Sequence, residues 1–134
     1  MAFFMRRFNL HVNLSQVFSL LIINMERLRS NLEFQSVYQT GKSYANRYFV
    51  MYMSKNDLGI NRLGVSVSKK IGNSVVRHHM KRLVKESFRL HEDMFNSGLN
   101  IVVIVRKGAE VISYKEVTDA LIHLMKLHHA LKTQ

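Results

Sequence analysis

A concentration of basic residues with helical periodicity lies between residues 69 and 89. The segment reads KKIGNSVVRHHMKRLVKESFR and holds seven of the chain's twenty Lys and Arg residues against one acid, Glu86. Asn73 can accept a hydrogen bond from the first free amides of a helix that follows it. At about 100° per residue, this helix would have a basic face and an apolar face. The basic residues are Arg77, His78, Lys81, Arg82, Lys85 and Arg89, and the apolar residues are Val75, Val76, Met80, Leu83 and Val84.

The basic face predicts a polyanionic partner. Like charges four residues apart oppose helix formation, and solvated helices usually relieve this repulsion with interspersed Glu residues. Only Glu86 is available here, and we expect it to point away from the basic face. The alternative is an ordinary solvated face. A net charge of +11 and a pI near 10.3 agree with nucleic acid or an anionic membrane surface as the partner, and charge alone does not separate the two.

The length and composition favour one domain. A chain of 134 residues with 47% hydrophobic residues can build one modest core. The sequence has no cysteine, which excludes disulfides, thiolate catalysis and Cys-based zinc sites and agrees with a cytoplasmic location. We assign residues 25–134 to the domain and residues 1–24 to an N-terminal extension, with Met25 as a possible natural start. The extension resembles a signal peptide only superficially. An alternative function for the chain is binding to a membrane surface, with residues 1–23 as an amphipathic anchor.

The remaining patterns predict an α+β fold in which helices cover a small mixed sheet, in the order α-β-β-α-β-α. Ser30 and Glu33 form a capping-box pattern before a helix over residues 31–39. Residues 44–53 and 63–67 alternate as strands and could form a hairpin, and residues 101–105 are apolar enough for a strand buried on both faces. A second capping box, Ser113 with Glu116, precedes a final helix that covers the core.

No catalytic residue or metal site is predicted. Magnesium-dependent nucleases gather several carboxylates, but the nine acids of this chain are scattered, and the neighbours Glu92 and Asp93 would diverge on a helix. His78-His79 and His128-His129 are adjacent pairs, whereas zinc-binding histidines on one helix are spaced i,i+4. The sequence therefore shows binding chemistry without evident catalytic chemistry.

The aromatic residues give a second binding signal. Phe34 and Tyr38 share one face of the first predicted helix, and Tyr48, Val50 and Tyr52 share one face of the first predicted strand. These residues could line a groove in which unpaired bases stack, or they could be an ordinary core cluster. Their proximity to a basic helix favours a groove for single-stranded nucleic acid.

The order of residues in the basic segment carries a family resemblance. The segment LGVSVSKKIGNSVVRHHMKR, residues 63–82, resembles the signature of the protein subunit of bacterial ribonuclease P. Residues 31–38 and 41–52, the late strand and the final helix are also similar to that family, so the resemblance covers about residues 27–131. It implies a ribonucleoprotein that removes the 5′ leader of precursor tRNA, with catalytic Mg²⁺ ions held mainly by a catalytic RNA and one protein for each RNA. It also implies a left-handed crossover between parallel strands, as in a ribosomal-protein fold, against the usual right-handed rule.

The resemblance also implies roles for particular residues. Contacts with the catalytic RNA are expected from Lys69, Lys70, Asn73, Arg77, His78, Lys81, Arg82, Lys85 and Arg89, and contacts with the leader from Phe34, Tyr38, Tyr48, Val50 and Tyr52. The family usually has Arg-Asn-Arg where this chain has Arg77-His78-His79, so a residue that titrates near neutrality replaces a fixed charge. An alternative function is an RNA-binding module, such as a ribosomal protein, with no role in cleavage.

Overall fold

The apolar strand β5 (Leu99–Val105) forms the centre of a five-stranded mixed sheet with the order β1-β4-β5-β3-β2. The computed structural model describes residues 25–133. On one side β5 pairs in parallel with β4 (Asn61–Ser66), and on the other it pairs antiparallel with β3 (Phe49–Lys55). The edges are β1 (Met25–Arg27), parallel to β4, and β2 (Lys42–Ala45), antiparallel to β3. The predicted α+β class and mixed sheet are confirmed.

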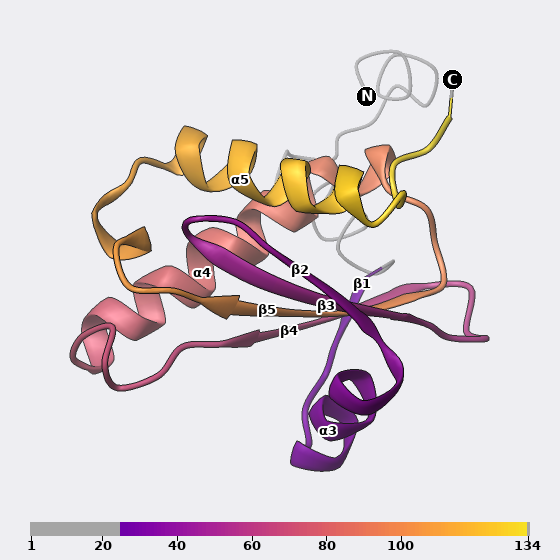
Figure 1. The fold of residues 1–134 in the computed structure, drawn as a ribbon, viewed down its shortest axis with the longest axis horizontal. Helices are drawn as coiled ribbons and strands as arrows, with labels where there is room; N and C mark the ends of the chain where they lie inside the picture. The colour runs from indigo at the N-terminus through magenta and orange to yellow at the C-terminus, as the bar shows by residue number, and fades with distance from the viewer. Residues whose placement is uncertain (1–24, 134) are drawn as a thin grey trace, which may run out of the picture.

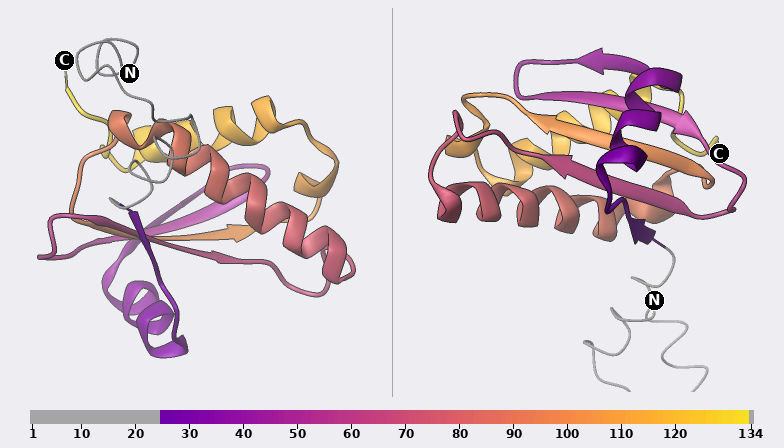
Figure 2. Two further views of the ribbon diagram at one scale, coloured as in Figure 1. Left: turned by 180° about the vertical axis from the view of Figure 1, so that it is seen from behind. Right: turned by 90° about the horizontal axis from the view of Figure 1, so that it is seen from below.

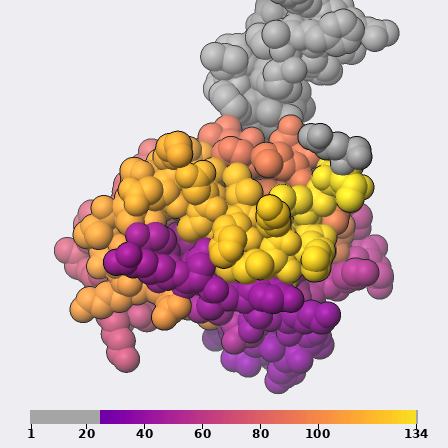
Figure 3. Space-filling view, turned by 45° about the horizontal axis from the view of Figure 1, so that its top comes forward, coloured from indigo at the N-terminus to yellow at the C-terminus, as the bar shows by residue number. Residues whose placement is uncertain are grey.

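Three helices cover the two faces of this sheet (Figure 1). The long α4 (Ser74–His91) and α5 (Tyr114–Leu127) lie on one face, and α3 (Asn31–Thr40) lies on the other. Short 3-10 turns, η1 (Glu92–Met94) and η2 (Ala109–Val111), connect α4 to β5 and β5 to α5. The space-filling view shows α5 on the surface with the β2 region alongside its edge (Figure 3). Together these elements form a three-layer arrangement of helices, sheet and helix.

Alternation along the strands creates one core on each face of the sheet. Phe49 and Met51 of β3 and Ile101 of β5 are fully buried in the main core beneath α4 and α5. Val102 of β5 faces the other way and forms a smaller core with Leu28 and with Val37 of α3. Because both faces of β5 are covered, its sequence is an almost uninterrupted apolar run.

The connection from β4 to β5 passes through α4 and is left-handed. Both strands run in the same direction, and the views in Figures 1 and 2 show α4 crossing back over the face opposite α3. With α4 toward the viewer and the strands pointing up, β5 lies to the left of β4. This is the rare crossover hand that the family resemblance implies.

Two strand predictions were wrong. The continuous strand over residues 44–53 is divided into β2 and β3, because the Asn46 side-chain oxygen accepts from the backbone N–H groups of Tyr48 and Phe49 and shapes a turn. The hairpin between the second and third predicted segments is also wrong, since β5 lies between β3 and β4. Two edge strands, β1 and β2, extend the predicted α-β-β-α-β-α order.

The predicted helix starts are confirmed by side-chain caps. The Asn73 side chain accepts from the Val76 N–H at 3.0 Å, and the Ser113 capping box with Glu116 is complete. Ser30 accepts from the Glu33 N–H, but the Glu33 carboxylate accepts from the Arg29 N–H at 2.8 Å. Glu33 therefore extends the cap of α3 one residue upstream of the usual capping box.

The predictions for residues 1–24, including a natural start at Met25 and a membrane anchor over residues 1–23, lie outside the described residues. Within residues 25–133, none of the helices combines the length and the apolar character needed to cross a membrane.

Candidate nucleic-acid interface

The basic face of α4 is formed as the helical phase predicts. Met80, Val84 and Phe88 are buried against the sheet. Arg77, Lys81, Lys85 and Arg89 are half-buried on the helix surface, and His78 and Arg82 are exposed. Lys69 and Lys70 are exposed in the turn before the helix, whereas the side-chain oxygen of Asn73 is used in the cap. Val75 was predicted on the packed face and is instead 75% exposed, because the first turn of α4 extends beyond the sheet.

A pocket of about 360 Å³ lies between this face and the edge strand β1. β1 contributes Met25, Glu26 and Arg27, and Leu63 of β4 contributes an apolar wall. The lining residues from α4 are His78, Lys81, Arg82, Lys85, Glu86 and Arg89. The edge strand thus turns part of the basic face of α4 into a concave site.

Glu86 was predicted to point away from the basic face, and this prediction was wrong. Its carboxylate pairs with Arg89, three residues along α4, and lines the same pocket. Arg27, Lys81 and Lys85 line the same pocket. Burial, followed by the charges of Arg27 and Lys81, lowers the pKa of Lys85. Glu86 therefore offsets only part of the positive charge at this site.

Arg77 and His79, which flank His78, lie outside the pocket. Arg77 is half-buried near the start of α4, and its Nε has no hydrogen-bond partner among the described residues. His79 is exposed, and the pocket is lined by His78 instead. The segment Arg77-His78-His79 therefore reaches the pocket only through its middle residue.

The predicted aromatic groove has three of its members in contact. The Tyr38 and Tyr52 rings meet edge to face with centroids 4.9 Å apart, and the Phe34 centroid is 6.5 Å from that of Tyr38. All three belong to the small core between α3 and the sheet, and burial, followed by Tyr52, raises the pKa of the Tyr38 hydroxyl. Val50 is half-buried two residues before Tyr52 in β3, opposite Ile104 of β5. These residues form a partly covered surface on the α3 face of the sheet.

Tyr48 does not join this surface. It precedes β3 in the Asn46 turn, packs against the main core, and has the Arg47 guanidinium 5.6 Å from its ring centroid. Strand alternation had grouped Tyr48 with Tyr52, but the turn before Phe49 ends that alternation.

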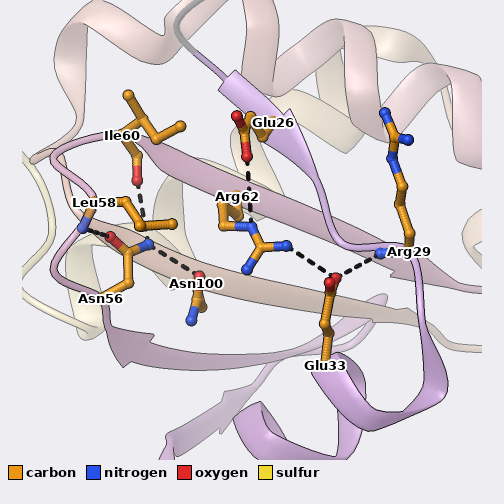
Figure 4. Close-up of polar contacts among 8 residues, drawn as sticks. All are labelled: Glu26, Arg29, Glu33, Asn56, Leu58, Ile60, Arg62 and Asn100. Carbon is orange, nitrogen blue, oxygen red and sulfur yellow. Dashed lines mark hydrogen bonds and ion pairs between the residues drawn. The ribbon is translucent and has the colours of Figure 1, made fainter.

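Arg62 of β4 joins β1 to α3 between two carboxylates (Figure 4). One guanidinium nitrogen lies 2.9 Å from a Glu33 oxygen, and Nε lies 3.8 Å from a Glu26 oxygen. The Glu33 pKa is lowered mainly by the Arg29 N–H hydrogen bond, with Arg62 contributing further. This network fixes the N-terminal end of the helix that carries Phe34 and Tyr38.

A metal site is not formed by the described part of the chain. Among residues 25–133, no group of three or more His, Cys, Asp or Glu side chains is placed to hold a metal ion. The residues gathered at the two surfaces are cations and aromatics, which suit phosphates and bases.

Comparison with known proteins decides the family. The family model described as Ribonuclease P matches residues 23–129. The ribonuclease P protein component of Lachnoclostridium phytofermentans is 53% identical over 108 residues, which cover 81% of this chain and 93% of that protein. The chain belongs to the ribonuclease P protein family.

Solved structures of this family share the fold. The Staphylococcus aureus RNase P protein at 2.0 Å aligns with a TM-score of 0.73 and 36% identity, covering 79% of this chain and 97% of that chain. The RNase P protein from Thermotoga maritima aligns with a TM-score of 0.71 and 36% identity, covering 76% of this chain and 96% of that chain. The family resemblance in residues 63–82 is thereby confirmed over most of the fold.

Sequence patterns alone did not reveal the contributions of Arg27, Arg62 and Leu63 to these surfaces. β1 has only three residues, too few to show a period, and its parallel pairing with β4 joins positions far apart in the sequence. The only local signal was Arg62 itself, a charged residue at the start of a strand whose later residues are mostly apolar or small.

Proposed function

We propose that the chain is the protein subunit of a ribonuclease P holoenzyme, in which α4 binds the catalytic RNA and the α3 face of the sheet holds the 5′ leader of precursor tRNA. The proposal rests on one observation: this member of the family has two different candidate binding surfaces on opposite faces of its sheet. The basic face of α4 suits phosphates, and the Phe34, Tyr38 and Tyr52 cluster on the opposite face of the sheet suits unpaired bases.

The α4 surface supplies binding and electrostatic support. Lys81, Arg82 and their neighbours would neutralise phosphates of a folded RNA and so reduce the Mg²⁺ concentration that the RNA needs. Mg²⁺ ions can activate a water nucleophile and stabilise a leaving oxygen. Since the described residues do not gather carboxylates for Mg²⁺, we assign those ions to the RNA and assign binding and orientation to this chain.

Reconstitution tests the function directly. The full-length chain is added to a bacterial ribonuclease P RNA at low Mg²⁺, and 5′ processing of precursor tRNA is measured. We expect accurate leader removal that the RNA alone does not achieve under these conditions. RNA binding without any stimulation of cleavage would contradict the proposal and favour the alternative of an RNA-binding module such as a ribosomal protein.

The α4 assignment is tested with Lys81→Ala and Arg82→Ala together. Affinity for the catalytic RNA should fall, and its salt dependence should flatten by up to about one unit of slope for each phosphate that the protein no longer neutralises. Lys115→Ala is the matched control, because Lys115 is an exposed cation on α5 that pairs with Asp119. If the double variant keeps the wild-type affinity and salt slope, α4 is not the RNA-binding face.

The leader assignment is tested with Tyr52→Ala. Loss of its ring should weaken binding of precursor tRNA to the holoenzyme while sparing mature tRNA, because only the precursor carries unpaired leader bases. Tyr48→Ala is the matched comparison, since this tyrosine packs in a different cluster. An equal loss for precursor and mature tRNA would exclude a leader site at Tyr52, and a leader-specific loss in Tyr48→Ala would place the site at the Asn46 turn.

A further inference from the structure

The pocket between β1 and α4 has a chemical character that a flat phosphate-binding surface lacks. Its volume of about 360 Å³ lies at the lower end of the range of small-molecule pockets, about 300–1,000 Å³. Met25 and the almost fully buried Leu63 supply apolar walls, and the methylene stems of the lining Lys and Arg residues add to them. Apolar walls can contact the faces of a flat ring. A phosphate group alone would gain nothing from them.

The cations around this pocket come from two elements and lack sufficient acidic partners. Arg27 approaches from β1, and Lys81, Lys85 and Arg89 approach from α4. Among the described residues, the Arg89 Nε has no hydrogen-bond partner, although its terminal nitrogen pairs with Glu86. Cations from two elements that converge on one pocket favour an anionic group between them.

The Glu86 carboxylate also belongs to the pocket lining, whereas the Glu26 carboxylate lies beside Arg62. Carboxylates repel a bare phosphate but accept hydrogen bonds from ring N–H and amino groups. Apolar walls, a cationic rim and hydrogen-bond acceptors together match a nucleobase with its attached phosphate. They match inorganic phosphate less well.

We propose that this pocket receives one unpaired nucleotide of the RNA that binds α4, with its base against Met25 and Leu63 and its phosphates on the cationic rim. The inference rests on the proposed function, because it assigns a nucleotide site within the α4 surface. β1 then acts in RNA recognition as well as in the sheet, since it supplies Met25 and Arg27 to the site.

The test is an NMR titration of the ¹⁵N-labelled full-length chain with adenosine monophosphate, ribose 5-phosphate and inorganic phosphate. Adenosine monophosphate should shift the amides of Arg27, Leu63 and Lys81, leave Tyr52 unchanged, and bind several-fold more tightly than ribose 5-phosphate. Equal affinity of the two compounds would overturn the proposal in favour of a phosphate site. Shifts centred on Tyr52 would overturn the proposal and place the nucleotide at the Phe34, Tyr38 and Tyr52 cluster.

A variant separates the base from the phosphate. Met25→Ala should reduce adenosine monophosphate affinity to that of ribose 5-phosphate and leave the affinity for inorganic phosphate unchanged. Lys85→Ala should weaken all three ligands, whereas Lys115→Ala on α5 should weaken none. Unchanged nucleotide affinity in Met25→Ala would contradict a base site at this wall.

Competition with RNA separates this inference from the proposed function. Ribonuclease P RNA should abolish saturation transfer from the protein to adenosine monophosphate, and a single-stranded leader oligonucleotide should not. If the RNA binds normally through Lys81 and Arg82 but the nucleotide stays bound, the pocket inference fails and the proposed function stands. If the Lys81→Ala and Arg82→Ala changes leave RNA binding unaltered, the proposed function fails first. Displacement by the leader oligonucleotide alone would overturn the assignment of the pocket to the RNA bound by α4.

Discussion

The side chain of Phe34 lies directly over Gly64, a residue of the neighbouring strand β4. A Cβ atom at position 64 would be 2.5 Å from the Phe34 Cζ, which is closer than carbon atoms approach without displacement. The glycine therefore allows α3 to pack its aromatic residue against the sheet. Its backbone needs no unusual conformation, so the small size of the residue is what matters.

We expect Gly64→Ala to push the Phe34 ring away from the sheet and to destabilise the fold by about 1–3 kcal/mol, the usual cost of overpacking. A double-mutant cycle with Phe34→Ala, measured by urea unfolding, tests this contact. The alanine at position 64 should cost less stability when Phe34 is already truncated. Strictly additive effects would show that the two residues do not constrain each other.

His79 is an exposed residue on α4, one position from the pocket residue His78. Arginine keeps its charge at all ordinary pH values, while histidine side chains gain a charge as the pH falls through neutrality. His79→Arg should therefore tighten binding to the catalytic RNA modestly at neutral pH and by less at low pH. His123→Arg, which adds the same charge on α5, is the control. Unchanged affinity at both pH values would exclude a direct RNA contact by residue 79.

At the scale of elements, the position of α3 depends on the Arg62 network. Glu33 accepts hydrogen bonds from Arg62 and from the Arg29 N–H, so a β4 side chain and the backbone between β1 and α3 hold the same helix terminus. Because Phe34 directly follows Glu33 in the chain, a shift of this terminus would move the aromatic surface. We therefore expect Arg62 to position α3.

Arg62→Met should lower the affinity of the holoenzyme for precursor tRNA with a leader several-fold, while affinity for mature tRNA changes little. Arg62→Lys should restore part of the loss, since it can keep one ion pair with Glu33. Arg29→Met is the matched control, because Arg29 contributes only its backbone N–H to Glu33. A uniform loss for both tRNAs, accompanied by a lower unfolding midpoint, would indicate general destabilisation instead.

The elements that could be predicted from the sequence are those determined by nearby residues. Asn73 and Ser113 cap their helices through N–H groups three residues away, and the apolar run of β5 reflects burial on both faces. Helical and strand periodicity, which also depend on nearby residues, predicted the basic face of α4 and the Phe34, Tyr38 and Tyr52 cluster.

Two kinds of feature were not predicted from the sequence. Some depend on pairing between residues distant in the sequence, and one depends on the hydrogen bonds of a single side chain. The insertion of β5 between β3 and β4 is decided by pairing across the whole chain, and β1 is recruited by β4 more than thirty positions later. Asn46 ends the alternation that grouped Tyr48 with Tyr52 by bonding to two backbone amides. The pocket beside α4 could not be foreseen without β1 in place.

At the scale of the whole molecule, His128 links the end of α5 to the sheet. Its Nε2 donates to the Met51 carbonyl oxygen at 2.9 Å, and its ring and that of Tyr44 meet edge to face with centroids 4.7 Å apart. Burial is the main cause of a lowered His128 pKa, and the charge of Lys42 adds to it, while the hydrogen bond to Met51 opposes it. The folded state therefore favours the neutral imidazole.

Because the folded pKa of His128 lies below its ordinary value of 6.5, its contribution to stability is fully present above about pH 6.5. It should be lost as the pH falls through the folded pKa, since the unfolded chain binds the proton first. Urea unfolding from pH 8 to pH 5 should show a steeper fall for the wild type than for His128→Gln. His123→Gln, the same substitution at an exposed histidine of α5, is the control. Parallel curves for wild type and His128→Gln would exclude this linkage.

The central position of β5 also governs when the molecule can form during its synthesis. A growing chain that has emerged from the ribosome as far as β4 holds β3 and β4 but not the strand that joins them. Neither strand can complete its hydrogen bonding until residues 99–105 arrive, so β4 presents an unsatisfied edge while α4 is being made. A chain truncated before Val105 should therefore be prone to aggregation. The complete sheet should form only after most of the chain has been translated.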